Sequence, residues 1–274
     1  MSSFKIFAMA SAAAGLAITA ANAADLPLAP IAVPVVQEFS GWYLRGDIGM
    51  TNQQTNSLTN VVAPGTSVGT KFLQFDSAPL YSLGGGYQFN NWLRADVTGE
   101  YRGKAQFHGQ QIATFGSSIL PDDYTASKSE WLFLANAYVD LGTWWCVTPF
   151  IGAGIGTSRN TISSFVDIGA TQAGANILST TYGENASKWN LAWAAYAGLS
   201  YKVTPGLSLE LTYRYVNLGS ATTGLTNSFD GVTVVNAPPF NFGTITSQDV
   251  MLGFRWNLGE PEPPVMAPPL IRKG

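Results

Sequence analysis

The chain has 274 residues, of which 11% are charged and 12% are aromatic, and it contains 29 glycines. This length accommodates one large all-β domain or two ordinary domains, and the composition favours many strands and turns over solvated helices. The formal net charge of −3 gives no reason to expect a nucleic-acid partner. Because Cys146 is the single cysteine, an intrachain disulfide is excluded.

The first 23 residues have the three regions of a secretory signal peptide. Lys5 supplies the positive charge, Ile6–Ala20 is apolar, and a small-x-small sequence predicts cleavage between Ala23 and Ala24. A transmembrane helix is the alternative, but it requires about 20 strongly apolar residues, whereas this run is short and rich in alanine. We therefore expect export, followed by an extended, proline-containing periplasmic lead-in over residues 24–40.

Eight later segments share a period of two. In Leu93–Arg102 every second residue is uncharged and mostly apolar, and the intervening residues are charged or hydroxylated, as in a strand with two different faces. No other stretch approaches the length of a membrane-spanning helix, so a membrane location requires a closed barrel. The predicted strands are Gly41–Met50, Ala78–Phe89, Trp92–Arg102, Glu130–Leu141, Thr148–Thr157, Trp189–Tyr201, Leu207–Leu218 and Ile245–Leu258.

The residues assigned to the outward face of these strands include no charged side chain. A Lys or Arg at the bilayer midplane costs about 2–4 kcal/mol, so a lipid-facing surface requires this absence. The sequence therefore predicts an all-β fold, an eight-stranded antiparallel up-and-down transmembrane β-barrel over residues 41–258.

The inward positions carry five arginines and seven carboxylates. An eight-stranded barrel is just wide enough to be filled by side chains, and inward glycines such as Gly84 and Gly154 leave room for long arginines. We therefore expect a closed lumen plugged by salt bridges. The predicted lumen charge network is Arg45, Asp47, Arg94, Asp96, Glu100, Arg102, Glu130, Asp140, Glu210, Arg214, Asp249 and Arg255.

The connections alternate between long and short. Residues 51–77, Gly103–Ser129, Ser158–Lys188 and Gly219–Thr244 are long, whereas Asn90-Asn91, Gly142–Val147 and Lys202–Gly206 are short. Outer-membrane barrels have long extracellular loops and short periplasmic turns, and an even strand number returns the chain to its starting side. We expect four polar surface loops, rich in Thr, Ser, Asn and Gly, and a proline-rich periplasmic tail over residues 259–274.

Aromatic residues gather near the predicted strand ends, where amphipathic rings prefer the headgroup level of a membrane. We interpret them as two girdles. The last strand also resembles a barrel-assembly signal, because Gly253 is followed by Trp256 and Leu258 at alternating positions. The girdle residues are Trp42, Trp92, Trp131, Trp144, Trp145, Trp189, Tyr213 and Trp256.

Four segments together resemble the small eight-stranded outer-membrane barrels of alphaproteobacteria, the OmpA/OmpX-like "porin family". The resemblance extends over nearly all of the mature chain and implies a membrane-organising surface protein without a known substrate. The segments are Ala23-Ala24-Asp25-Leu26-Pro27, Ser40-Gly41-Trp42-Tyr43, Thr148-Pro149-Phe150-Ile151-Gly152-Ala153-Gly154 and Leu211-Thr212-Tyr213-Arg214-Tyr215.

Other motifs give weaker signals. The glycines of Gly152–Gly156 have the wrong spacing for a dinucleotide loop, and we interpret them as small residues inside a narrow barrel. The single histidine, His108, falls in a predicted loop without an oriented nucleophile and third group, so catalysis is not expected. We interpret Cys146 as a buried or interfacial small residue. Several cations fall near the predicted outer rim, where lipopolysaccharide phosphates would lie: Lys71, Lys104, Lys128, Arg159 and Lys188.

We expect a non-enzymatic integral outer-membrane protein that contributes to envelope integrity and displays polar loops, with no cofactor and no metal site. The expected partners are outer-membrane lipid and lipopolysaccharide, together with the barrel-assembly machinery during biogenesis, and we expect a monomer. Three alternatives remain open at this point. They are a small-solute porin, a surface protein that binds haem or a host factor, and a secreted soluble barrel that binds an apolar ligand.

Overall fold

The computed structural model describes residues 40–61, 66–170, 178–229 and 233–259, which form β-strands joined by turns and short connections. These residues include no helix that is long and apolar enough to cross a membrane. The predicted signal peptide, nearly all of the lead-in and nearly all of the proline-rich tail lie outside the described residues.

Eight strands form a closed ring of antiparallel hydrogen-bonded pairs. The ring closes between its first and last strands, where Tyr43 lies opposite Asn257 and Thr55 lies opposite Ile245. A closed ring leaves no sheet edge facing lipid, and the predicted up-and-down barrel is confirmed. The ring strands are β1 (Gly41–Thr55), β4 (Ala78–Gln88), β5 (Leu93–Phe115), β6 (Ser118–Asp140), β7 (Val147–Ala170), β9 (Ala186–Lys202), β10 (Leu207–Asn217) and β15 (Ile245–Asn257).

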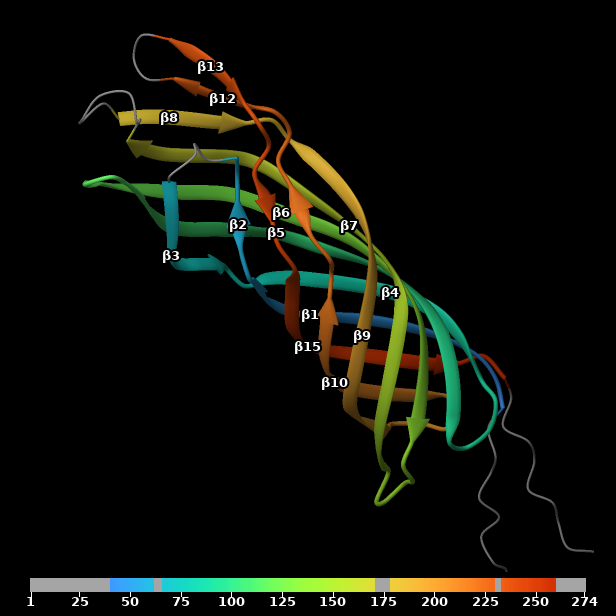
Figure 1. The fold of residues 1–274 in the computed structure, drawn as a ribbon. Coiled ribbons are helices and arrows are strands. Elements are labelled where there is room, and N and C mark those ends of the chain that lie inside the picture. Colours follow the sequence, from blue (N-terminus) through green and yellow to red (C-terminus); the bar gives the residue numbers. More distant parts are fainter. Residues whose placement is uncertain (1–39, 62–65, 171–177, 230–232, 260–274) are drawn as a thin grey trace, which may run out of the picture. The chain divides into compact units, whose positions relative to one another are not determined.

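Three ring strands continue far beyond the ring. β5 and β6 have 23 residues each and β7 has 24, whereas a tilted strand needs about 9–11 residues to cross a bilayer. Figure 1 shows further strands beside these extensions, and we call the assembly the hairpin sheet. The added strands are β3 (Thr66–Phe75), which pairs with β5, and β8 (Leu178–Gly183), β12 (Thr226–Phe229) and β13 (Val234–Ala237), which follow β7 in that order.

The prediction of polar loops over Gly103–Ser129, Ser158–Lys188 and Gly219–Thr244 is wrong in large part, because most of the described residues there lie in strands. Polar and apolar residues are mixed on both faces of the extensions. On β5, for example, Phe107 and Gln111 both face inward and are buried. A mixed pattern has no apolar alternation, so the period of two that revealed the ring strands does not mark these segments.

The hairpin sheet has an aromatic core of its own. Phe242 contacts the rings of Phe75, Phe107 and Phe165, with centroid distances of 6.2, 4.9 and 6.4 Å. All four side chains are buried. These segments therefore pack around an apolar centre, which solvated loops do not have. Phe242 belongs to a second, three-stranded sheet composed of β11 (Ala221–Thr222), β14 (Asn241–Phe242) and β2 (Leu58–Thr59).

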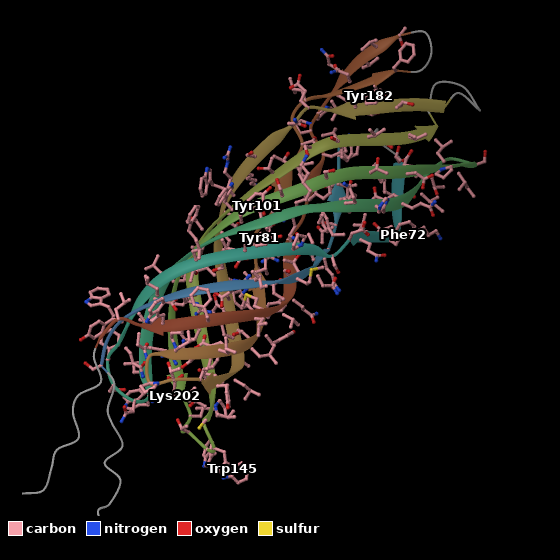
Figure 2. The ribbon with its side chains drawn as sticks, turned by 180° about the vertical axis from the view of Figure 1, so that it is seen from behind. Phe72, Tyr81, Tyr101, Trp145, Tyr182 and Lys202 are labelled. Atoms are coloured by element: carbon pink, nitrogen blue, oxygen red, sulfur yellow. The ribbon has the colours of Figure 1, made fainter. Side chains whose placement is uncertain are left out.

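The two faces of the ring strands have the predicted polarity. On β6 the outward positions from Trp131 to Val139 are all exposed and apolar, and the residues between them are buried. Figure 2 shows Tyr81 and Tyr101 on the outer surface of the ring. A soluble barrel with its apolar face inward is therefore the wrong alternative. We call this outward apolar surface the apolar belt.

The short connections lie at one end of the ring, which Figure 2 marks with Trp145 and Lys202. Between β4 and β5, the Asn90 side chain accepts hydrogen bonds from the backbone nitrogens of Trp92 and Leu93 at 3.0 and 2.8 Å. Between β6 and β7, Trp145 and Cys146 have positive φ angles of 51° and 69°. Cys146 is exposed, which contradicts the buried position and leaves the interfacial one of the two that the sequence left open.

Candidate functional site: the charged interior of the barrel

All twelve side chains of the predicted lumen charge network lie inside the ring, and none is more than 6% exposed. The alternation of the strands explains this placement, because residues two apart on a strand share a face. The ion pairs among these side chains form two clusters, one toward the hairpin sheet and one toward the short turns.

The hairpin-side cluster joins three cations to three carboxylates. Arg102 Nη1 and Nη2 donate to the two carboxylate oxygens of Asp249 at 3.0 and 2.8 Å. Arg214 Nη1 and Nη2 donate to Glu100 at 2.9 and 2.6 Å, and its Nε donates to Asp249 at 2.9 Å. Bidentate pairs of this kind fix both side chains in one geometry. The cluster consists of Glu100, Arg102, Lys128, Glu130, Arg214 and Asp249.

Lys128 belongs to this cluster, and its predicted position at the outer rim is wrong. The side chain is fully buried, forms an ion pair with Glu130 and donates a hydrogen bond to Gln53 Oε1 at 2.8 Å. Glu130 also pairs with Arg102. Because β6 continues upstream of Glu130, the two-residue period carries Lys128 to the same inward face. Extending the predicted strand by two residues would have found it.

The turn-side cluster centres on Glu210. Its carboxylate accepts a hydrogen bond from Arg255 Nε at 2.9 Å, and Arg94 Nη1 lies 3.3 Å away. Arg45 Nη2 is 3.8 Å from Glu210, and the same guanidinium donates to both oxygens of Asp47 at 2.9 and 3.1 Å. The cluster consists of Arg45, Asp47, Arg94, Asp96, Asp140, Glu210 and Arg255.

Uncharged polar side chains connect the two clusters. Asn136 donates to Asp96 at 2.8 Å and accepts a hydrogen bond from the Tyr196 hydroxyl at 2.8 Å. The Arg214 guanidinium lies 5.9 Å from the centre of the Tyr196 ring, within reach of a cation–π interaction. Asn136 and Tyr196 were not among the predicted members of the network, although both occupy inward positions on predicted strands. The interior is thus one layered polar network.

Inward glycines bring neighbouring strands and side chains close together. A Cβ at Gly84 would lie 2.6 Å from the Val97 carbonyl oxygen, and one at Gly154 would overlap the amide oxygen of Asn136. The glycines of Gly152–Gly156 lie in β7, between β6 and β9, and so do not form a dinucleotide loop. The space that a larger residue would need is taken up by the packed interior.

His108 lies in β5, opposite Gln74 and Thr125, and not in the predicted loop. Within the described ranges, no three histidine, cysteine or acidic side chains are arranged to hold a metal ion. The interior carboxylates bind guanidinium groups, which makes a rigid, charge-paired filling the main chemical property of the site.

A smaller polar site lies among the hairpin extensions, beyond the apolar belt. Asp122, Tyr124 and Asp167 line a cavity of about 390 Å³ between the hairpin sheet and β2. Burial is the largest cause, and repulsion from neighbouring carboxylates the second, of a raised pKa at both aspartates. The pKa of Asp167 is raised to about 7 and that of Asp122 to about 6. Tyr124 lies directly opposite Asp167 on the neighbouring strand.

The residues of the predicted assembly signal lie at the end of β15. Gly253 faces inward against Asp47, whereas Trp256 and Leu258 are exposed on the outer surface. The backbone nitrogen of Leu258 donates to the Trp42 carbonyl oxygen at 2.8 Å, so the last and first strands are joined up to this point. The predicted cleavage residues Ala23 and Ala24 lie outside the described residues.

Comparison with known proteins identifies the family. Residues 10–256 match the outer membrane protein beta-barrel domain. The chain belongs to this family. It is an outer-membrane β-barrel protein.

Two relatives and one solved structure illustrate the range of similar proteins. An uncharacterised protein of Brucella suis biovar 1 is 32% identical over 74% of this chain and 78% of its own length. A protein of Rickettsia bellii named as a candidate adhesin is 29% identical over 69% of this chain and 77% of its own. The crystal structure of Neisserial surface protein A matches 80% of this chain and 98% of its own, at 17% identity and a TM-score of 0.42.

Proposed function

We propose that this protein is a non-enzymatic barrel whose interior is closed by ion pairs, and that it stabilises the envelope while displaying its hairpin sheet at the cell surface. The observation that carries the proposal is the burial of five arginines, Lys128 and seven carboxylates in two hydrogen-bonded clusters. An eight-stranded ring is just wide enough to be filled by side chains. An interior filled in this way leaves no continuous path for a solute.

The chemistry of the interior supports a structural role. A general acid or base must reach the substrate proton that it transfers. The interior carboxylates are instead buried, and their oxygens accept hydrogen bonds from guanidinium groups, as Asp249 does from Arg102 and Arg214. Removing one partner of a buried pair costs about 3–5 kcal/mol, because the other charge is left unpaired. Such pairs therefore fix the relative positions of the strands that carry them.

Single-channel recording in a planar bilayer tests closure of the interior. The refolded protein is expected to give no stable conductance of porin size. The paired substitution Glu100→Ser with Arg214→Ser removes one bidentate pair without leaving either charge alone, and is expected to produce measurable conductance steps. Lys202→Ser, at the exposed end of β9, is the matched control. Stable conductance of the unaltered protein would overturn the proposal and favour the porin alternative.

A second candidate function is adhesion through the hairpin sheet. The Rickettsia bellii relative is named as a candidate adhesin, and the outer face of the hairpin sheet exposes large apolar side chains. Exposed apolar patches in a polar surround are typical of protein contact sites. Figure 2 shows two of these side chains, Phe72 and Tyr182, away from the short turns. The exposed residues are Phe72, Ile168, Tyr182, Phe229 and Val234.

Adhesion can be tested with bacteria that express the protein, by counting cells bound to a cultured epithelial layer. The double substitution Tyr182→Ser with Phe229→Ser is expected to reduce binding several-fold. Trp145→Ser removes a still more exposed aromatic side chain, 97% against 59% for Tyr182 and 46% for Phe229, at the opposite end of the barrel and is expected to have no effect. Equal binding by all three strains would exclude an adhesive role for this face.

A further inference from the structure

On three neighbouring strands, the apolar belt ends abruptly at the side of the hairpin sheet. On β7 the outward residues change from Ile155 through Thr157 to Arg159 and then Thr161. Arg159 lies directly opposite Trp131 of β6 and Trp189 of β9. Tryptophan prefers the headgroup level of a membrane, so this row marks the interface. The outward row beyond it consists of Ser129, Thr161 and Ser187, all with hydroxyl groups.

Arg159 differs from the arginines of the interior. Each interior arginine pairs with a carboxylate, whereas the Arg159 side chain is exposed and has neither an ion pair nor a hydrogen bond with another described residue. An outward cation is tolerated near the interface, where it costs about 0–1 kcal/mol, but not at the midplane. The guanidinium is therefore free to pair with an anion from outside the described protein.

Aromatic rings on the strands that flank Arg159 contact one another in a continuous chain. Tyr101 and Trp131 have ring centroids 5.0 Å apart, and Trp131 stacks on Phe133 at 6.3 Å. Phe133 in turn stacks on Trp189 at 6.4 Å. Such ring faces can pack against sugar rings and the upper parts of acyl chains while the guanidinium binds a charged group.

A second exposed cation lies two strands away. Lys104 occupies the irregularity in the pairing of β5 with β6, between Arg102 and Ala105. Neighbouring strands are about 4.8 Å apart, so β5 and β7 are separated by roughly 10 Å. Of the other rim cations predicted from the sequence, Lys128 is buried and Lys188 donates to Ser220 at 2.8 Å.

We propose that Arg159, between Trp131 and Trp189 and with Lys104 nearby, binds a phosphate group of a phosphorylated glycolipid, lipopolysaccharide, in the outer leaflet. Arginine binds phosphate through two parallel N–H donors, and the hydroxyl row beyond it offers further hydrogen bonds to phosphate and sugar oxygens. The site lies on the lipid-facing surface, so this proposal goes beyond the proposed function. The two proposals have one assumption in common, which is that the hairpin sheet faces the cell exterior.

The proposal can be tested with the full-length mature protein in phosphatidylcholine nanodiscs, using purified lipopolysaccharide as the probe and native mass spectrometry to measure the bound fraction. Arg159→Gln is expected to weaken binding about tenfold, in line with the loss of one charge-assisted contact. Arg159→Lys keeps the charge without the bidentate geometry, so its lipopolysaccharide binding is expected to lie between that of the unaltered protein and that of Arg159→Gln. Lys202→Gln, at the opposite end of the ring, is expected to bind as the unaltered protein does. Heat-modifiable migration on gels shows that each variant is folded.

Three outcomes would overturn the proposal. They are unchanged binding by Arg159→Gln, equal binding of the same lipopolysaccharide after its phosphates are removed, and displacement by an equal amount of phosphatidylglycerol. The last outcome would assign the site to anionic lipids in general. Nanodiscs expose both ends of the barrel, so the result does not depend on orientation, on closure of the interior or on adhesion. Failure here is therefore distinguishable from failure of the proposed function.

Discussion

At the residue scale, the turn between β6 and β7 contains a local conflict between sequence and backbone. Cys146 has a φ angle of 69°, in the left-handed region that costs a residue with a Cβ about 1–2 kcal/mol relative to glycine. Cys146→Gly is therefore expected to raise the free energy of unfolding by about 1 kcal/mol, measured by urea titration in lipid vesicles. Ser117→Gly, in the turn between β5 and β6 where φ is not positive, is the control. A gain for both variants, or for neither, would contradict the argument.

A single outward residue also tests the assignment of the two faces. Leu252 lies in the middle of β15 on the apolar belt and is 56% exposed. Leu252→Arg is expected to destabilise the protein by about 2–4 kcal/mol, the cost of an arginine near the midplane. Asn227→Arg, on β12 of the hairpin sheet, is expected to cost roughly 0–1 kcal/mol because that position lies beyond the belt. Refolding titrations into vesicles compare the two. Equal free energies of unfolding for the two variants would mean that the inner and outer faces of β15 are assigned the wrong way round.

At the element scale, the eight ring strands could be predicted because lipid imposes apolar residues on one face and the narrow interior collects the charges on the other. The starts of β1, β4 and β10 coincide with the predicted ones. The hairpin extensions could not be predicted in the same way, because water on one side and a mixed core on the other impose no strict alternation. The interior network followed from the strand period alone, and Lys128 was missed as an interior residue because the predicted strand began two residues too late to include it.

The hairpin sheet should respond to pH through Asp122 and Asp167. Their carboxyl groups in the folded protein have pKa values of about 6 and about 7, above the ordinary value of 3.8. Between about pH 4 and pH 7 the folded state therefore binds more protons than the unfolded state, so stability falls as the pH rises through this window and levels off above it. After burial, the negative charges of Asp122 and Asp123 raise the pKa of Asp167, and that of Asp123 raises the pKa of Asp122, whereas a hydrogen bond with Tyr124 lowers the pKa of Asp122.

Asp167→Asn is expected to remove much of this dependence, because the amide cannot ionise. Hydrogen exchange of the β7 and β8 amides at pH 5 and pH 8 measures it, with greater protection expected at pH 5 in the unaltered protein and a smaller difference in the variant. Asp123→Asn, whose side chain is exposed, is the matched control and should change the difference less. A larger pH effect in Asp167→Asn than in the unaltered protein would contradict the assignment.

At the scale of the whole molecule, the ring has two different ends. One end carries short turns and is marked by exposed tryptophans such as Trp42, Trp145 and Trp256, whereas the other continues into the hairpin sheet. Trp131 and Trp189 lie at the hairpin side, so aromatic residues occupy both edges of the apolar belt, as expected for two girdles. Most of the charged side chains lie between these edges, and Lys128 lies on the hairpin side of Trp131 along β6. The apolar belt, the two girdles and the charged interior are thus all consistent with a ring whose belt lies in the hydrocarbon core and whose girdles lie at the two interfaces.

The remaining choice is which end faces outward, and epitope tags decide it. Outer-membrane barrels keep long connections at the cell surface and short turns in the periplasm. A tag inserted after Gly116, in the turn between β5 and β6, should bind antibody on intact cells. A tag after Pro205, in the turn between β9 and β10, should bind only after the outer membrane is permeabilised. A tag at Gly274 should behave like the one after Pro205, since an even number of strands returns the chain to its starting side. The reverse pattern would place the hairpin sheet in the periplasm, and adhesion to other cells and binding of an outer-leaflet glycolipid would then both be impossible.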